Sequence, residues 1–328
     1  MRFKLASRAV VAGVAAALAL SACGSSDTPA DTSAANVGGL EKTTIKMGAL
    51  PIPDSAALYI ARDKGFFKAE GLTVEIEPVP GGAQAQQGLM GGTLDATQTN
   101  YVSTFLAVSK GQKMKIISDL YQAAPNSFNL MVPKDSGIKT PADLKGKKIA
   151  VNSKQNIGTL AVTTVLKTNG LTEKDVEFVE FPFPEMGAQL ASKTVDAAWM
   201  TEPALTAVQK NLGAQKLADT MVDSTADFPI AGVAVTEKFA TENPKTVAAF
   251  QRAVAKAQQI AATDRKAVEE ILPTYTKIDA ATAAVITLGS FPTSLDETRL
   301  QRVADLMLEQ GYLTSPLQAK AILPGNLG

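Results

Sequence analysis

Residues 44–79 decide the fold, and they read TIKMGALPIPDSAALYIARDKGFFKAEGLTVEIEPV. The apolar run 44–50 predicts a β-strand, and the apolar residues of 54–64 recur on one side of a predicted helix. Gly65 is a residue type that commonly ends a helix, and the strict alternation over 73–79 predicts a second strand. A strand, a helix and another strand in this order are typical of a parallel sheet with helices on its faces.

The same alternation continues along the chain and predicts two lobes. Further strands are expected at 93–99, 113–120, 148–151, 176–181 and 197–200, with extended pieces at 130–133 and 230–235. Further helices are expected at 84–90, 102–109, 158–169, 185–192, 203–211, 244–264, 265–272 and 295–310. This order predicts a first lobe of residues 44–132 and 230–328 and a second lobe of residues 133–229. The chain would cross between them near Val132-Pro133 and again near 229–231.

Four segments carry a resemblance to a known family. They are ARDKGFFKAEGL at 61–72, GGTLDA at 91–96, TPADLKGKKIA at 140–150 and VDAAWMTEP at 195–203. Their order and spacing resemble the substrate-binding proteins of nitrate, sulfonate and taurine ABC transporters and their relatives that bind thiamine-precursor pyrimidines. Each segment also has a structural interpretation, because glycines and aromatic residues end helices and aspartates cap turns.

The resemblance implies a type II periplasmic-binding-protein fold of class α/β. Each lobe would be a mainly parallel sheet flanked by helices, and the ligand cleft would lie between the lobes. It also implies a monomeric solute-binding component without a cofactor, which delivers a small molecule to an ABC permease and its ATPase subunit. An exported sensor of the same fold remains an alternative.

The N-terminal residues predict export and a lipid anchor. Three basic residues precede the apolar run 9–20, which is shorter than the roughly 20 residues that span a bilayer. The run ends in LSAC, which resembles a bacterial lipobox with Cys23 as the acylated residue; the alternative is an ordinary signal peptide with a chance cysteine. We expect cleavage of residues 1–22, a flexible tether over 23–43, and a protein held at the extracytoplasmic face of the cell membrane.

The composition excludes several classes of function. The chain has no His, which rules out Ser-His-Asp and Cys-His nucleophile systems, a conventional zinc-hydrolase site and imidazole acid–base chemistry. The related fold includes a pyrimidine-synthesising branch with an active-site His and a Cys-rich segment, both of which this chain lacks. Loss of three basic residues with the signal would leave 29 Lys and Arg against 32 Asp and Glu, so nucleic-acid binding is not expected. No metal site is expected either.

Candidate ligand-binding residues follow from strand order, because ligands bind beyond the carboxyl ends of strands in open α/β sheets. The first lobe offers Pro53, Asp54, Ser55, Gly82, Gln84, Asn100, Tyr101 and Tyr121. The second lobe offers Asn152, Ser153, Asn156, Ile157, Gly158, Thr159 and Glu202.

Each type of candidate has a physical reason and an alternative. Glycines let backbone N–H groups approach a ligand, and tyrosines can stack on a planar one. Asp54, Ser55 and Glu202 could instead cap helices. The ligand charge is open: hydroxyls and helix N-termini favour a nitrate-like or sulfonate-like anion, whereas the tyrosines and acids favour a planar nitrogen-containing molecule.

Overall fold

The computed structural model describes residues 39–325. Cys23, the predicted signal segment and most of the predicted tether lie outside the described residues. Residues 40–43, which the sequence analysis assigned to that tether, belong to the folded domain instead. Leu40 is buried, and the Glu41 carboxylate accepts hydrogen bonds from the backbone N–H groups of Lys245 and Thr246. Within the described part of the chain, no helix has both the length and the apolar character needed to cross a bilayer.

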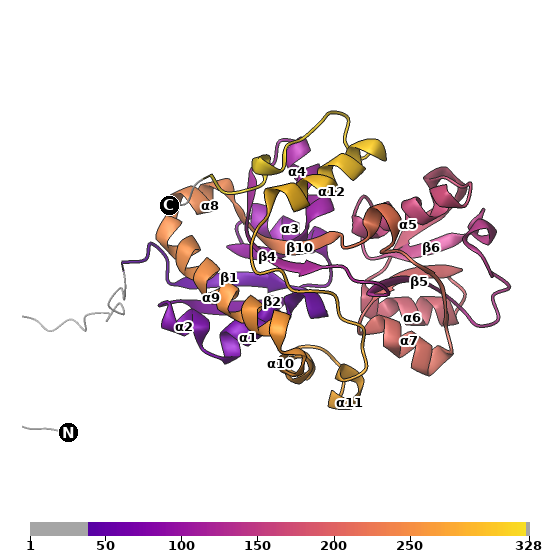
Figure 1. Cartoon of the computed structure of the whole chain (residues 1–328), viewed down its shortest axis with the longest axis horizontal. Coiled ribbons are helices and arrows are strands. Elements are labelled where there is room, and N and C mark those ends of the chain that lie inside the picture. The colour runs from indigo at the N-terminus through magenta and orange to yellow at the C-terminus, as the bar shows by residue number, and fades with distance from the viewer. Residues whose placement is uncertain (1–38, 326–328) are drawn as a thin grey trace, which may run out of the picture. The chain divides into compact units, whose positions relative to one another are not determined.

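The first sheet has five strands in the order β2-β1-β3-β10-β4 (Figure 1). Its strands are β1 (Thr44–Ala49), β2 (Thr73–Pro78), β3 (Ala96–Asn100), β4 (Met114–Gln122) and β10 (Pro229–Thr236). Its helices are α1 (Ala56–Asp63), α2 (Phe66–Ala69), α3 (Gly82–Met90), α4 (Tyr101–Ser109), α8 (Glu237–Glu242), α9 (Pro244–Thr263), α10 (Arg265–Ile271) and α12 (Glu297–Glu309). Strand β1 pairs in parallel with β2 and β3, as the opening stretch of sequence predicts.

The second sheet repeats this arrangement in the order β7-β6-β8-β5-β9. Its strands are β5 (Phe128–Val132), β6 (Lys148–Val151), β7 (Glu177–Glu180), β8 (Ala197–Thr201) and β9 (Gln215–Asp219). Its helices are α5 (Ile157–Thr168), α6 (Phe183–Ala191) and α7 (Ala204–Leu212), and the short α11 (Ala280–Ala283) belongs to the C-terminal segment. The resulting α/β architecture of two mixed sheets flanked by helices confirms the predicted fold class.

Each sheet contains one reversed strand, and that strand arrives directly from the other sheet. Strand β10 runs antiparallel to β3 and β4, and β5 runs antiparallel to β8 and β9. Residues 128–132 therefore belong to the second lobe, and the placement of this piece in the first lobe was wrong. Pro133 ends β5, where a missing N–H is tolerated, and the chain crosses between the sheets over residues 123–127.

Two aspartates accept equivalent hydrogen bonds from strands of the two lobes. The carboxylate of Asp95, before β3, accepts from the backbone N–H of Lys46 on β1 at 3.0 Å. The carboxylate of Asp196, before β8, accepts from the N–H of Lys148 on β6 at 2.9 Å. These aspartates thus fix neighbouring strands at their amino ends, far from the edge where a ligand would bind.

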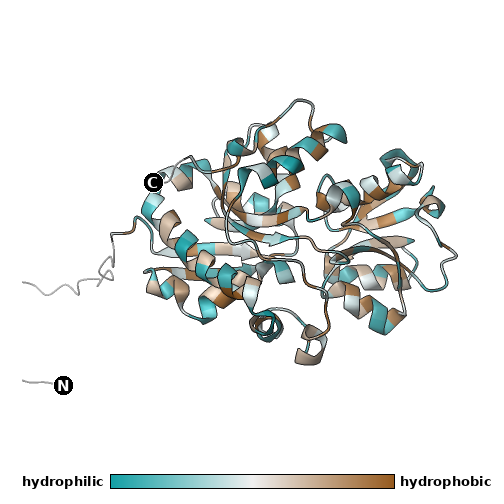
Figure 2. Cartoon of the chain, viewed as in Figure 1, coloured by the Kyte–Doolittle hydropathy of each residue, from teal (hydrophilic) through white to brown (hydrophobic). Residues whose placement is uncertain are grey.

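The aromatic residues after α1 are structural. Gly65 adopts a left-handed φ of 71°, which lets the chain turn from α1 into α2. Phe67 is buried against Phe250 of α9, with ring centroids 5.2 Å apart. Figure 2 shows the corresponding distribution of hydropathy, with apolar residues along the strands and many polar residues on α9 and α12.

Candidate functional site

A narrow pocket lies between the two sheets, with about 400 Å³ of space that includes open solvent. Nine residues of the first lobe and five of the second line it. Five of the predicted site residues line this pocket: Asp54, Gly82, Asn100, Asn152 and Ile157. Its other lining residues are Leu50, Ile52, Gln98, Thr99, Phe128, Phe183, Trp199, Ile230 and Ala231.

Four helices begin at this pocket. Gly82 and Ile157 are the first residues of α3 and α5, Phe183 is the first residue of α6, and Asn100 precedes α4. The carboxyl ends of the two sheets face each other here, so these four helices, each of which follows a strand, start at the pocket. Helix N-termini carry partial positive charge, which gives the pocket a field that favours acceptor groups and anions.

Asp54 is the ionisable residue of the pocket. Its side chain is buried, and its Oδ1 has no hydrogen-bond partner among the described residues. Burial raises the pKa of Asp54 to about 7. Of the residues that the structure describes, no Lys or Arg lines the pocket, so no basic side chain pairs with this carboxylate there. A ligand that donates hydrogen bonds to Asp54 would satisfy it, because a buried and unpaired acceptor is costly.

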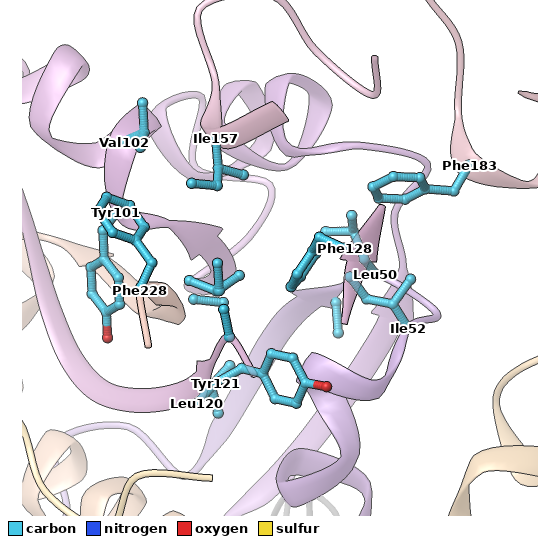
Figure 3. Packing of buried hydrophobic residues seen from close by; sticks show 14 of the residues in the cluster. Leu50, Ile52, Tyr101, Val102, Leu120, Tyr121, Phe128, Ile157, Phe183 and Phe228 are labelled. Carbon is cyan, nitrogen blue, oxygen red and sulfur yellow. The ribbon is translucent and has the colours of Figure 1, made fainter. Parts of the chain in front are cut away.

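Aromatic rings form the wall contributed by the second lobe (Figure 3). The Phe128 ring stacks on Trp199 with centroids 5.2 Å apart and planes 12° apart, and Phe183 lies at 5.8 Å from the same indole. The Trp199 Nε1–H donates to Thr220 Oγ1 at 2.9 Å, which fixes the orientation of the indole. Figure 3 shows Phe128 and Phe183 beside Leu50 and Ile52 of the first lobe. A flat ring would find apolar faces on both sides of this pocket.

Comparison with known proteins identifies the family. The family model described as "NMT1/THI5 like" matches residues 52–267, well over half of the chain. The chain belongs to the NMT1/THI5-like family. This membership confirms the resemblance carried by the four sequence motifs and the solute-binding role that the resemblance implies.

Relatives of this NMT1/THI5-like protein include binding proteins for different solutes. It is 27% identical over 276 residues to a Brucella abortus chain named as a binding protein, covering 80% of this chain and 83% of that one. It is also 27% identical to the riboflavin-binding protein RibY of Chloroflexus aurantiacus, covering 75% of this chain and 72% of that one. The fold matches the alkanesulfonate-binding protein SsuA of Xanthomonas axonopodis pv. citri with a TM-score of 0.71 at 20% identity, covering 85% and 98% of the two chains.

Several predicted site residues of this family member hold the structure together instead of lining the pocket. Tyr101 is fully buried and donates from its hydroxyl to Asp119 Oδ1 at 2.8 Å. The Tyr121 hydroxyl accepts from the backbone N–H of Gly289. Burial raises the pKa of both phenols, so both stay neutral. The two tyrosines thus fasten β4 to α4 and to the C-terminal segment.

Ser55 and Thr159 likewise act on the backbone around the pocket. The Ser55 hydroxyl donates to Leu50 O and to Gln98 Oε1, which also accepts from the Leu50 N–H. This small network shapes the loop that carries Asp54. In the second lobe, Thr159 Oγ1 accepts from the N–H of Asn156 at 3.0 Å and caps α5. Pro53, Gln84, Ser153 and Gly158 also lie outside the set of residues that line the pocket.

Glu202 caps a helix. Its carboxylate accepts from the N–H and the hydroxyl of Thr206 in the first turn of α7, at 3.0 and 2.9 Å. It also accepts from the N–H of Thr287 at 3.2 Å, which ties the C-terminal segment to the second lobe. Burial raises the pKa of Glu202. Of the two interpretations of Glu202 left open by the sequence, this geometry matches the cap.

The two lobes also touch each other directly at one side of the pocket. Asn156 Nδ2 of the second lobe donates to Ser103 Oγ of the first at 3.2 Å. Nearby, Lys110 Nζ on α4 donates to Gln155 Oε1 at 3.4 Å. Asn156 therefore joins the lobes.

Sequence reasoning missed the aromatic wall. Trp199 and Phe128 belong to strands β8 and β5, which lie wholly in the buried interior of the second sheet. In sequence, a buried strand that lines a pocket has the same apolar pattern as a buried strand of the core. Only its position at the edge of the sheet next to the pocket distinguishes the two. Phe183 had a usable signal, since it starts a helix directly after β7.

Proposed function

We propose that this protein is the extracytoplasmic solute-binding component of an ABC importer, and that its ligand is a planar nitrogen-containing molecule, neutral or cationic. The observation that carries the ligand class is the buried Asp54 carboxylate, which faces a pocket lined by aromatic rings and by no described Lys or Arg. Amine and ring N–H groups would supply the donors that Asp54 Oδ1 and Asn152 Oδ1 lack among the described residues. The riboflavin-binding relative supports this class, because flavins are planar and rich in nitrogen.

The geometry suggests how binding would be coupled to transport. A ligand between Asp54 and the rings of Phe128 and Trp199 contacts both lobes at once. Such a ligand stabilises the closed arrangement of the lobes. The stabilisation equals the difference between the ligand's binding free energies for the closed and the open arrangement. The crossing segments, at 123–127 and between β9 and β10, would act as the hinges. The permease would then recognise the closed form.

A second candidate ligand is an anion such as nitrate or a sulfonate. The observation in its favour is that four helices begin at the pocket. Asp54 weighs against it, because an ionised carboxylate repels an anion, and the protonated form prevails only below about pH 7. The two ligand classes therefore require opposite protonation states of one residue.

A thermal-shift screen at about pH 8 separates the two ligand classes. The probes are cytosine, 2,4-diaminopyrimidine, nitrate, ethanesulfonate and taurine. A ligand at 100 times its dissociation constant adds about 2.7 kcal/mol of stability, which gives a clear shift. We expect a shift with a pyrimidine and a loss of that shift in Asp54→Asn. A shift with nitrate or a sulfonate alone would overturn the proposed ligand class.

The dependence of affinity on pH is the sharper test. For cytosine, which keeps its charge over this range, the affinity should fall from about pH 8 to about pH 6 as Asp54 takes up a proton. For an anion, the affinity should rise over the same interval. The Asp54→Asn variant should remove the dependence in either case, which assigns it to this carboxylate.

We further propose that Cys23 carries the lipid that keeps the protein at the membrane, and that the protein has no catalytic activity. The support for the anchor is the LSAC segment, whose Cys23 is the single Cys of the sequence. Full-length protein produced in a bacterium should partition into the detergent phase of Triton X-114, and Cys23→Ser should move it to the aqueous phase. Detergent partitioning of both forms would contradict lipidation at this cysteine.

A further inference from the structure

An apolar groove adjoins the pocket between the two sheets, which is called the inner pocket from here on. The groove is much larger, with about 1840 Å³ of space that includes open solvent. The two hollows share Leu50, Ile52 and Phe183, which line both. Figure 3 shows these three side chains close together at the edge of the inner pocket. The two hollows therefore meet at these three buried side chains.

Both lobes contribute to the groove. On one side are the loop after β1, the loop after β2 and residues 275–278 of the C-terminal segment; on the other are α6 and α7. Six prolines line it, together with a row of alanines on the two helices, and its charged lining residues are Glu185 and Lys277. Proline backbones are conformationally restricted, so a large part of the groove is formed before any ligand arrives.

A tyrosine pair supports the boundary between groove and pocket. Tyr275 stacks on Tyr59 with ring centroids 3.9 Å apart and planes 5° apart. Its hydroxyl donates to the backbone oxygen of Ile52 at 3.1 Å. Tyr275 thus holds the Ile52 loop in place from the groove side, at the boundary between the two hollows.

We propose that the natural ligand carries an apolar, ring-sized substituent that lies in this groove while its polar heterocycle occupies the inner pocket. The inference rests on the proposed ligand class and extends it. The two hollows adjoin at three shared lining residues, which argues for one ligand that reaches both. Burial of the substituent's apolar surface in the groove would strengthen binding. A substituent in contact with both lobes would also strengthen the link between binding and closure.

A matched pair of probes tests the groove: 2,4-diaminopyrimidine and 5-benzyl-2,4-diaminopyrimidine, measured by calorimetry on the full-length chain at about pH 8. We expect the benzyl compound to bind at least tenfold more tightly. Ala188→Glu places a charge at an exposed position of α6 in the groove, away from the inner pocket. It should abolish most of the gain from the benzyl group and leave the affinity for the smaller probe unchanged.

Gln209→Glu is the matched control, because Gln209 is exposed on α7 and lies outside the groove lining. It should alter neither affinity. If the smaller probe binds and the benzyl group adds nothing, the groove proposal is overturned and the ligand class stands. An equal loss of both affinities in Ala188→Glu also overturns the groove proposal. If neither probe binds, the ligand class itself fails, and the groove inference fails with it.

Discussion

Gly158 packs directly against the indole of Trp199. A Cβ atom at position 158 would lie 2.7 Å from Trp199 Cε3 and 3.0 Å from Cζ3. The first turn of α5 can therefore approach β8 this closely only because residue 158 has no side chain. Trp199 lines the ligand pocket, so this contact sets where the aromatic wall stands.

We predict that Gly158→Ala is destabilising and weakens ligand binding. The added methyl group must displace a fully packed indole, and overpacking of this kind costs about 1 to 3 kcal/mol. Urea denaturation should report that loss, and calorimetry with 2,4-diaminopyrimidine should show an affinity several-fold lower. Gly82→Ala is the comparison for stability, since a Cβ there would meet nothing nearer than 3.8 Å. Equal stability of the two variants would contradict the packing argument.

The buried Asp54 predicts a fall in stability with rising pH. Its pKa is raised from the usual 3.8 to about 7 in the folded protein. Between these values the unfolded chain releases a proton that the folded protein retains, so the free energy of unfolding decreases from about pH 4 to about pH 7 and then levels off. Asp54→Asn should remove this component and stabilise the ligand-free protein at pH 8 by about 4 kcal/mol. Urea titrations of both proteins across this pH range give the comparison.

Glu202→Gln should affect stability more than binding. The neutral amide accepts hydrogen bonds less strongly than the carboxylate, so the caps on Thr206 and Thr287 weaken and roughly 1 kcal/mol is lost. Because Glu202 does not line the pocket, the affinity for a pyrimidine probe should change less than about threefold. A large loss of affinity with unchanged stability would instead place Glu202 at the ligand.

Much of the fold followed from local patterns, because helices and buried strands impose periodicity on the sequence. Strand β9 was missed, since its residues QKLAD are polar and at most half-buried and carry no apolar run. The sheet to which β5 belongs was also assigned wrongly. Its apolar residues predict a buried strand, but strand pairing joins residues far apart in sequence, such as Leu130 and Trp199.

The sequence predicted candidate site residues correctly where position along the chain is enough to place a residue at the pocket. Asp54 and Asn152 follow strands and Asn100 is the last residue of β3, so the chain direction alone brings all three to the carboxyl edge. Tyr101 and Tyr121 also lie at element ends, but their side chains point to Asp119 and Gly289. The direction of a side chain depends on partners that are distant in sequence, and no local pattern records it.

The hydrogen bond from Asn156 to Ser103 predicts how strongly closure contributes to affinity. It joins the lobes at 3.2 Å and exists only while they are together. Ser103→Ala removes the acceptor, which costs about 0.5 to 1.5 kcal/mol in that state alone. The affinity for 2,4-diaminopyrimidine should therefore fall about two- to tenfold, and the loss should appear as faster dissociation in stopped-flow measurements.

A serine at the far end of the same helix provides the control for this experiment. The Ser109 hydroxyl donates to Leu106 O within α4, and among the described residues it has no hydrogen bond to the second lobe. Ser109→Ala should leave the dissociation rate unchanged. In small-angle scattering, Ser103→Ala should also raise the ligand concentration needed for compaction. Identical dissociation rates for the two variants would show that the Asn156–Ser103 contact contributes nothing to holding the lobes together, and that the ligand itself supplies the free energy of closure.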